Sequence, residues 1–213
     1  MKKSDKKKVY EAYNQIIEWF DENRSKDLAM EKHYLAFIQK HIPAGGTILD
    51  VGCGTGEPMA DFFIKQKYKV TGVDASTKMI DLCKQRFPTG RWILADMREL
   101  ALPEQFDLVI AWHSLFHLPP EDQEPTLNLL ASFVKQGGLF IFTGGPEYGE
   151  IWSENGGYDL YHASLATEDY QKILAKNNFK ILIHKIRDPD CGEATVWVAK
   201  KCSKITITRY IQC

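Results

Sequence analysis

Residues 50–58 read Asp50-Val51-Gly52-Cys53-Gly54-Thr55-Gly56-Glu57-Pro58, the strongest motif of the sequence. An apolar run precedes it and an amphipathic stretch follows it, so it joins a buried strand to a helix. Glycines at three alternate positions let the backbone approach a ligand closely and adopt conformations closed to other residues. The spacing is G-x-G-x-G, which differs from the G-x-G-x-x-G of dinucleotide-binding loops. This stretch therefore predicts a ligand-binding loop of another kind.

Apolar runs and amphipathic stretches alternate along the chain on either side of this loop. The runs that read as buried strands are 47–51, 69–73, 92–95, 106–111 and 139–143, with helical stretches at about 57–66, 76–87 and 120–135. Such alternation predicts a parallel sheet with helices on both faces. A further helix is expected at about 167–177. It precedes strands at 179–186 and 195–200, whose turn-rich connection predicts an antiparallel pair.

Three aspartates end three successive predicted strands: Asp50, Asp74 and Asp96. In open α/β sheets, ligands bind beyond these carboxyl ends. The carboxylate of Asp50 repels a pyrophosphate but suits ammonium and sulfonium charges, and Asp74 is placed to accept both hydroxyls of a ribose. Asp96 can accept a hydrogen bond from an exocyclic amine, and Met97 can cover a purine face. The structural alternative is that Asp74 and Asp96 only cap helices.

Together these motifs resemble those of the class I S-adenosylmethionine-dependent methyltransferases, within an uncharacterised bacterial subgroup of small-molecule type. The resemblance spans residues 30–200 and is carried by 48–56, 73–76 with Met79, 95–97, 106–109 and 137–139. It implies a Rossmann-like α/β three-layer sandwich. Its seven-stranded, mostly parallel sheet would have the order 3-2-1-4-5-7-6, with only strand 7 antiparallel. Two features depart from the family pattern: His113 stands where relatives carry Asp, and residues 203–213 extend past the usual end.

The resemblance also implies a cofactor and a reaction. S-adenosyl-L-methionine would donate a methyl group to an O, N or C atom of a small molecule and leave as S-adenosyl-L-homocysteine. The residues expected to bind the cofactor are Asp50, Gly52, Cys53, Gly54, Thr55, Gly56, Asp74, Ala75, Met79, Asp96, Met97 and Trp112. Two alternatives stay open: a non-catalytic regulator that binds S-adenosylmethionine, and a nicotinamide-dependent oxidoreductase.

The methyl acceptor is expected between the loop after the fourth strand and residues 145–166. The latter segment is glycine-rich, and we expect it to be irregular and to act as a lid or substrate loop. Trp112, His117, Tyr161 and His162 are the residues expected to contact the acceptor. The catalytic candidates are His117, His162 and Tyr161, with either histidine as a general base. The alternatives are that His117 packs at a helix start and that Tyr161 and His162 form an ordinary N-terminal turn.

Composition excludes several classes of function. The formal net charge is −1, from 27 basic and 28 acidic side chains, which is not the basic field of a nucleic-acid binder. The segment after strand four reads Ala111-Trp112-His113-Ser114 and lacks the Pro-Pro-aromatic motif of base-modifying amino-methyltransferases. No apolar run approaches the ~18 residues of a membrane span, and no signal peptide is evident. Five cysteines without C-x-x-C spacing predict reduced thiols, no metal site and a cytoplasmic protein.

The 213 residues are expected to form a single domain over 1–202. Two N-terminal helical stretches, at about 5–22 and 27–41, fall within residues 1–43. Residues 203–213 form a tail whose alternating Ile205, Ile207 and Tyr210 predict either an edge strand or disorder. We expect a monomer or a homodimer.

Overall fold

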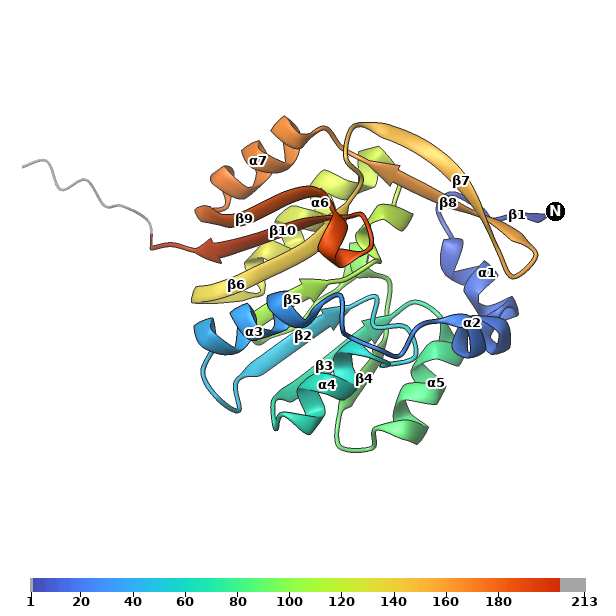
Figure 1. The fold of residues 1–213 in the computed structure, drawn as a ribbon, viewed down its shortest axis with the longest axis horizontal. Coiled ribbons are helices and arrows are strands. Elements are labelled where there is room, and N and C mark those ends of the chain that lie inside the picture. Colours follow the sequence, from blue (N-terminus) through green and yellow to red (C-terminus); the bar gives the residue numbers. More distant parts are fainter. Residues whose placement is uncertain (1, 204–213) are drawn as a thin grey trace, which may run out of the picture.

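The computed structural model describes residues 2–203 (Figure 1). The expectation of an edge strand or disorder in the tail concerns residues outside this range. No helix among the described residues is long and apolar enough to cross a membrane.

A seven-stranded sheet forms the middle layer, in the order β4-β3-β2-β5-β6-β10-β9. Its strands are β2 (Thr47–Val51), β3 (Lys69–Asp74), β4 (Arg91–Leu94), β5 (Phe106–Ala111), β6 (Val134–Gly144), β9 (Phe179–Asp188) and β10 (Ala194–Lys201). The first five strands in this order (β4, β3, β2, β5 and β6) pair in parallel, whereas β10 runs antiparallel to both of its neighbours. This order and the single antiparallel strand confirm the sheet that the resemblance implies.

Helices cover both faces of this sheet (Figure 1). The helices of one face are α3 (Lys32–His41), α4 (Met59–Lys65) and α5 (Thr77–Arg86), and those of the other are α6 (Pro120–Ser132) and α7 (Thr167–Lys176). Successive residues of the central strands enter opposite cores: Leu108 and Ile110 pack with α3 and α4, and Val109 and Ala111 pack with α6. A strand buried on both sides has no polar alternation, which explains the continuous apolar runs of the sequence.

Residues 145–166 differ from the prediction of an irregular segment. They contain a hairpin of β7 (Gly149–Asn155) and β8 (Tyr158–Ser164), which pair antiparallel, and β1 (Lys2–Lys3) adds to β8 in parallel. The two-residue turn between the strands is Gly156-Gly157, with φ of +55° and +86°. Positive φ at both turn residues matches the right-handed twist of paired strands, and glycine adopts it at least cost. The glycines that suggested a loop therefore close a hairpin.

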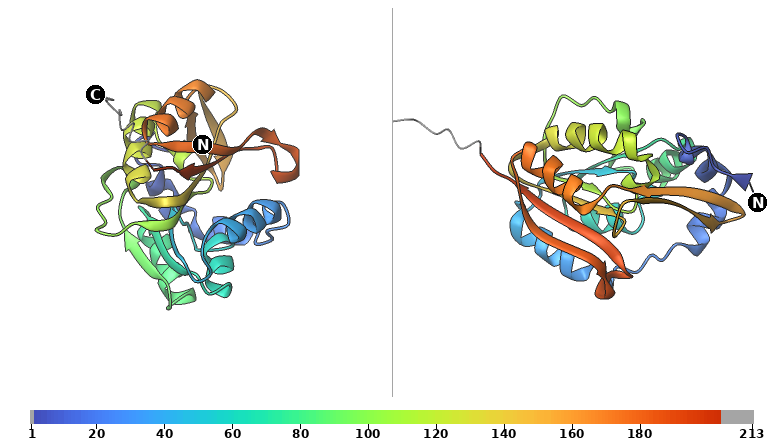
Figure 2. Two further views of the ribbon diagram at one scale, coloured as in Figure 1. Left: turned by 90° about the vertical axis from the view of Figure 1, so that its left-hand side faces the viewer. Right: turned by 90° about the horizontal axis from the view of Figure 1, so that it is seen from above.

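The N-terminal segment packs on this hairpin. The stretch predicted as one helix is split at Ile16 into α1 (Val9–Gln15) and α2 (Ile17–Asn23). Val9, Ala12 and Ile16 form a separate apolar cluster with Leu160, Tyr161 and Ala163 of β8. The right-hand view in Figure 2 shows the N-terminal segment beside the hairpin. We call α1 with β7 and β8 the covering layer, because it lies over the carboxyl end of the parallel strands.

Candidate functional site

A cavity of about 270 Å³ lies between the carboxyl ends of the parallel strands and the covering layer. It is the place that the three strand-end aspartates predict. The sequence-predicted residues that line it are Asp50, Gly52, Cys53, Gly54, Asp74, Ala75, Met79, Asp96, Met97, Trp112, His117 and His162. Residues from six elements or loops, distant in sequence, thus meet at one site.

Three predicted site residues do not line this cavity. Thr55 is buried, and Gly56 packs toward α5, where an added Cβ would lie 2.9 Å from the ring of Phe87. Tyr161 is fully buried in the apolar cluster of the covering layer, with its ring 4.8 Å from Lys6 Nζ. Neighbouring side chains on a strand point to opposite faces, so His162 reaches the cavity and the Tyr161 side chain does not. The expectation that Tyr161 contacts the acceptor is thereby corrected.

The glycine loop is tied to the end of β3 by its own backbone. Gly52 has φ of +72°, and its N–H donates to the carbonyl of Val73 at 2.7 Å. A Cβ at this position would lie 2.3 Å from Cβ of Ser114, so only glycine can be accommodated. The N–H of Gly54 donates to Oδ2 of Asp74 at 3.0 Å. The loop and the second strand-end aspartate therefore form one preassembled unit.

The alternative that the strand-end aspartates cap helices is correct for Asp96 and not for Asp74. Ser76, rather than Asp74, is the N-cap of α5, since its Oγ accepts from the N–H of Met79 at 3.2 Å. Asp96 does cap the short 3₁₀-helix η1 (Met97–Glu99), and its carboxylate is also held by Arg98, with Nη2 2.6 Å from Oδ2. Burial tends to raise the pKa of Asp96, but the hydrogen bonds from Arg98 outweigh it and lower that pKa. Asp96 is therefore ionised and already paired with Arg98 when a ligand binds.

Asp50 is buried, and its Oδ2 has no hydrogen-bond partner among the described residues. Burial raises the pKa of Asp50 to about 7; the positive charge of Arg24 opposes this shift and the charge of Asp74 adds to it. An uncompensated carboxylate in such a place is costly, so its position favours a ligand that brings a positive charge or hydrogen-bond donors.

Arg24 lines the same cavity, and the sequence analysis missed it. Its guanidinium lies 5.4 Å from the ring of Phe20, and no carboxylate of the described residues is within 4.0 Å. Burial lowers the pKa of Arg24. A lone arginine between two helices carries no pattern that separates it from a solvated charge. Only its tertiary position beside Asp50 marks it, and the pair offers a cation and an anion to one ligand.

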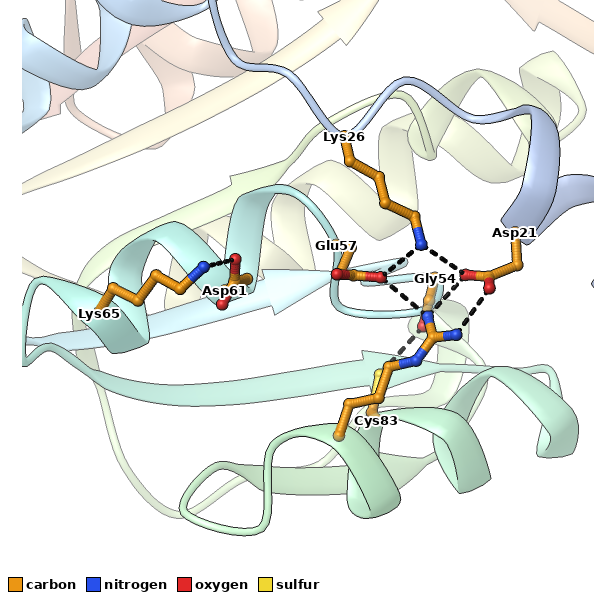
Figure 3. Close-up of polar contacts among 8 residues, drawn as sticks. Asp21, Lys26, Gly54, Glu57, Asp61, Lys65 and Cys83 are labelled. Atoms are coloured by element: carbon orange, nitrogen blue, oxygen red, sulfur yellow. Dashed lines mark hydrogen bonds and ion pairs between the residues drawn. The ribbon is translucent and has the colours of Figure 1, made fainter.

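A network of charges anchors the segment that carries Arg24 (Figure 3). The guanidinium of Arg86 on α5 holds Asp21 through two bonds of 2.6 Å and Glu57 through one of 2.9 Å. Lys26 completes the network, with Nζ 3.0 Å from Oε2 of Glu57. Since Asp21 and Lys26 flank Arg24 in the chain, the network fastens its backbone to the end of the glycine loop. A bidentate Arg–carboxylate pair of this kind gives geometric precision as well as energy.

His117 is held by hydrogen bonds on both ring nitrogens. Its Nδ1 lies 2.9 Å from the carbonyl of Tyr161, which can only accept, so Nδ1 carries the proton. Its Nε2 therefore accepts from the hydroxyl of Tyr13, also at 2.9 Å. Burial, together with the neighbouring His162, lowers the pKa of His117 to about 3. This histidine is a neutral bridge between α1, β8 and the strand-four loop, which favours the packing interpretation over a role as base.

His162 is arranged differently. Its Nδ1 lies 3.1 Å from the carbonyl of Leu160, so Nδ1 donates and Nε2 holds the lone pair. The described residues provide no hydrogen-bond partner for Nε2, and the side chain lines the cavity. Burial lowers the pKa of His162, which keeps it neutral and able to accept a proton near neutral pH. Of the three catalytic candidates, His162 alone has a free basic atom at the cavity.

His117 should make the protein sensitive to acid. Its folded-state pKa of about 3 lies below the ordinary 6.5, so the unfolded chain binds the extra proton first, and the free energy of unfolding falls as pH drops through this interval. At pH 4.5 the protonation of His117 should lower the free energy of unfolding by about 2–3 kcal/mol. His117→Gln keeps a donor and an acceptor without the titration. Urea unfolding of both proteins at pH 7 and 4.5 should show a smaller acid loss in the variant; an equal loss would contradict the assignment.

No group of three or more His, Cys, Asp or Glu side chains within residues 2–203 is arranged to hold a metal ion. The cysteines Cys53, Cys83 and Cys191 are buried and free. The thiol of Cys83 donates to the carbonyl of Gly54 at 3.1 Å, so it supports the glycine loop from α5 (Figure 3).

Comparison with known proteins gives a consistent result. Residues 48–138 match the family described as a methyltransferase domain. YqeM of Bacillus subtilis, named as a methyltransferase, is 33% identical over 112 residues, which cover 50% of this chain and 45% of that protein. Glycine N-methyltransferase of Rattus norvegicus is 26% identical over 221 residues, covering 92% of this chain and 73% of that protein. The chain spans about half the length of the first curated relatives it matches.

The fold is shared with solved structures. A crystal structure of an S-adenosylmethionine-dependent methyltransferase from Clostridium acetobutylicum superimposes with a TM-score of 0.69 at 15% sequence identity. The match covers 90% of this chain and 100% of that one. The seven-stranded architecture is therefore retained across a sequence divergence at which few side chains are shared.

Proposed function

We propose, from the premise that this chain belongs to the class I S-adenosylmethionine-dependent methyltransferases, that it transfers a methyl group from S-adenosylmethionine to a small molecule. The observation that carries the proposal is the cavity at the carboxyl ends of the strands. There the glycine loop, Asp50 and Asp74 form one unit, and Asp96 lies at the end of the next strand.

The residues present suit this cofactor. The unpartnered oxygen of Asp50 and the unpaired guanidinium of Arg24 match the ammonium and carboxylate of its methionine end. Asp74 would hold the ribose, and Asp96 with Met97 would border the adenine. When bound, the cofactor supplies an activated methyl group and its sulfur keeps the electron pair of the broken bond. The protein's task is then to hold the acceptor in line and to exclude water.

The alternative classes differ in what the cavity must do. A dinucleotide would bring a pyrophosphate to the glycine loop, where the buried Asp50 opposes it, so a nicotinamide-dependent oxidoreductase is disfavoured. A regulator that only binds S-adenosylmethionine needs no acceptor site. The free Nε2 of His162 beyond the cofactor residues supports an enzyme instead.

Turnover distinguishes the enzyme from the regulator. The full chain would be incubated with S-adenosylmethionine carrying a deuterated methyl group and a bacterial metabolite extract. Mass spectrometry should detect S-adenosylhomocysteine together with a labelled small molecule. Tight cofactor binding without a labelled product from any fraction would favour the regulator.

Cofactor affinity should depend on pH through Asp50. With a pKa of about 7 in the free protein, Asp50 is mostly protonated at pH 6 and cannot attract an ammonium group. S-adenosylhomocysteine should therefore bind about tenfold more weakly at pH 6 than at pH 8. Asp50→Asn should bind more weakly at pH 8 and lose most of this dependence. Calorimetric titrations at both pH values test this. If the affinity of the variant changes between pH 6 and pH 8 as much as that of the wild type, Asp50 is not the source of the pH dependence.

A further inference from the structure

One end of the cavity is walled by aromatic and imidazole rings. Trp112, His113 and Phe116 follow each other with ring centroids 5.4 and 6.0 Å apart, and Phe116 lies 5.2 Å from His162. The ring of His117 lies 4.6 Å from that of His162 and 5.4 Å from that of Tyr13. All six side chains line the cavity, and we call them the ring wall: Tyr13, Trp112, His113, Phe116, His117 and His162.

The ring wall itself holds no carboxylate or ammonium group. Two charged residues of the cavity, Asp96 and Arg98, pair with each other, and the carbonyl of Lys7 accepts from Arg98 at 2.7 Å. Glu57 is paired with Arg86, and Asp74 binds the glycine loop. These contacts place the charges around the expected cofactor residues rather than along the ring wall.

Two charged groups of the cavity act on the ring wall. Burial raises the pKa of Tyr13, which the charge of Arg24 lowers and that of Asp74 raises further. Burial, followed by the positive charge of Arg24, lowers the pKa of His113 to about 4. His113, His117 and His162 are thus neutral near neutral pH. A protonated amine at this end would meet the sulfonium of the cofactor, and the ring wall has no carboxylate to balance the two charges. An acceptor that develops negative charge would be stabilised by that sulfonium.

Given the proposed function, we infer that the methyl acceptor is a planar aromatic compound with an ionisable hydroxyl group, that is, a phenol. Its ring stacks within the ring wall, and its hydroxyl faces Nε2 of His162.

The chemistry balances without another reactant. The hydroxyl proton passes to Nε2 of His162 and from there to solvent. The bond that forms joins the phenol oxygen to the methyl carbon, and the bond that breaks is the carbon–sulfur bond of the cofactor. The electron pair stays on sulfur, so a cation and an anion become two neutral products. Such a charge-neutralising step is favoured in a site from which water is excluded.

Binding to the S-adenosylhomocysteine-loaded full chain tests this inference without requiring turnover. Three probes of similar size are compared by calorimetry: phenol, cyclohexanol, which lacks the flat ring, and benzylamine, which keeps the ring but is charged. Phenol should bind about tenfold more tightly than either other probe. Phe116→Leu should weaken phenol binding several-fold and leave S-adenosylhomocysteine affinity within about threefold.

The outcomes separate the inference from the function on which it rests. Failure of S-adenosylhomocysteine to bind would overturn the proposed function itself. Normal binding of that product, with benzylamine or cyclohexanol bound as tightly as phenol, would overturn the phenol inference alone. Absence of any phenol binding to the loaded chain would overturn it as well.

Discussion

Asp74→Ala is expected to weaken S-adenosylhomocysteine binding by about 10²–10⁴-fold. The two ribose hydroxyls would each lose a hydrogen bond to a charged acceptor, at roughly 1.5–3 kcal/mol per bond. The carboxylate also accepts from the backbone N–H of Gly54 and of Ser76, so part of the loss reflects a less ordered glycine loop. Asp74→Asn keeps one acceptor oxygen and should give an intermediate affinity, measured by calorimetry at pH 8.

Asp107→Asn is the matched control for this variant. Asp107 lies near the start of β5, at the opposite edge of the sheet from Asp74, where it accepts from the N–H of Thr47 at 2.8 Å and from Lys135 at 2.9 Å. Its removal should reduce stability but leave cofactor affinity within about threefold. Equal losses of affinity in the Asp74 and Asp107 variants would mean that Asp74 acts only through the fold.

His162→Gln is expected to lower turnover by about 10²–10⁴-fold at saturating cofactor, because it removes the one free basic atom of the three catalytic candidates. S-adenosylhomocysteine affinity should stay within about threefold, since the residues proposed to hold the cofactor are others. The measurement is initial rates with the labelled donor and the acceptor fraction that gives most product. Because the pKa of His162 is lowered by burial, wild-type turnover should lose this base only below pH 6.5.

Tyr161→Phe is the control on the same strand. Its side chain does not line the cavity and its hydroxyl faces Glu150, so loss of the hydroxyl should change neither cofactor affinity nor turnover by more than about threefold. A large fall in turnover for Tyr161→Phe, with His162→Gln unaffected, would reverse the two assignments. A loss of cofactor affinity in His162→Gln would place this histidine at the cofactor.

The sheet was predictable from sequence because its strands are buried on both faces. Continuous apolar runs such as 108–111 read as buried strands once helices alternate with them. The glycine loop and its aspartates follow from the same regularity, since each ends a strand at one edge. Thr55 and Gly56 were misplaced because the motif does not say which loop residues face the ligand and which face α5.

The covering layer was not predictable in the same way. Its hairpin carries mixed polar and apolar residues, and it packs on segments far away in sequence, such as Ser4, whose hydroxyl accepts from the N–H of Tyr161 at 3.1 Å. Unless residues 158–164 are known to form a strand, the sequence does not show that the side chains of Tyr161 and His162 point to opposite faces. Arg24 has no sequence signal either, because only the fold brings it to the cavity together with Asp50.

The most direct test of the central claim is a calorimetric titration of the full chain with S-adenosylhomocysteine and, separately, with NAD. An S-adenosylmethionine-binding methyltransferase should bind S-adenosylhomocysteine in the micromolar range, ~8 kcal/mol, and give no measurable heat with NAD. Binding of NAD without binding of S-adenosylhomocysteine would contradict it.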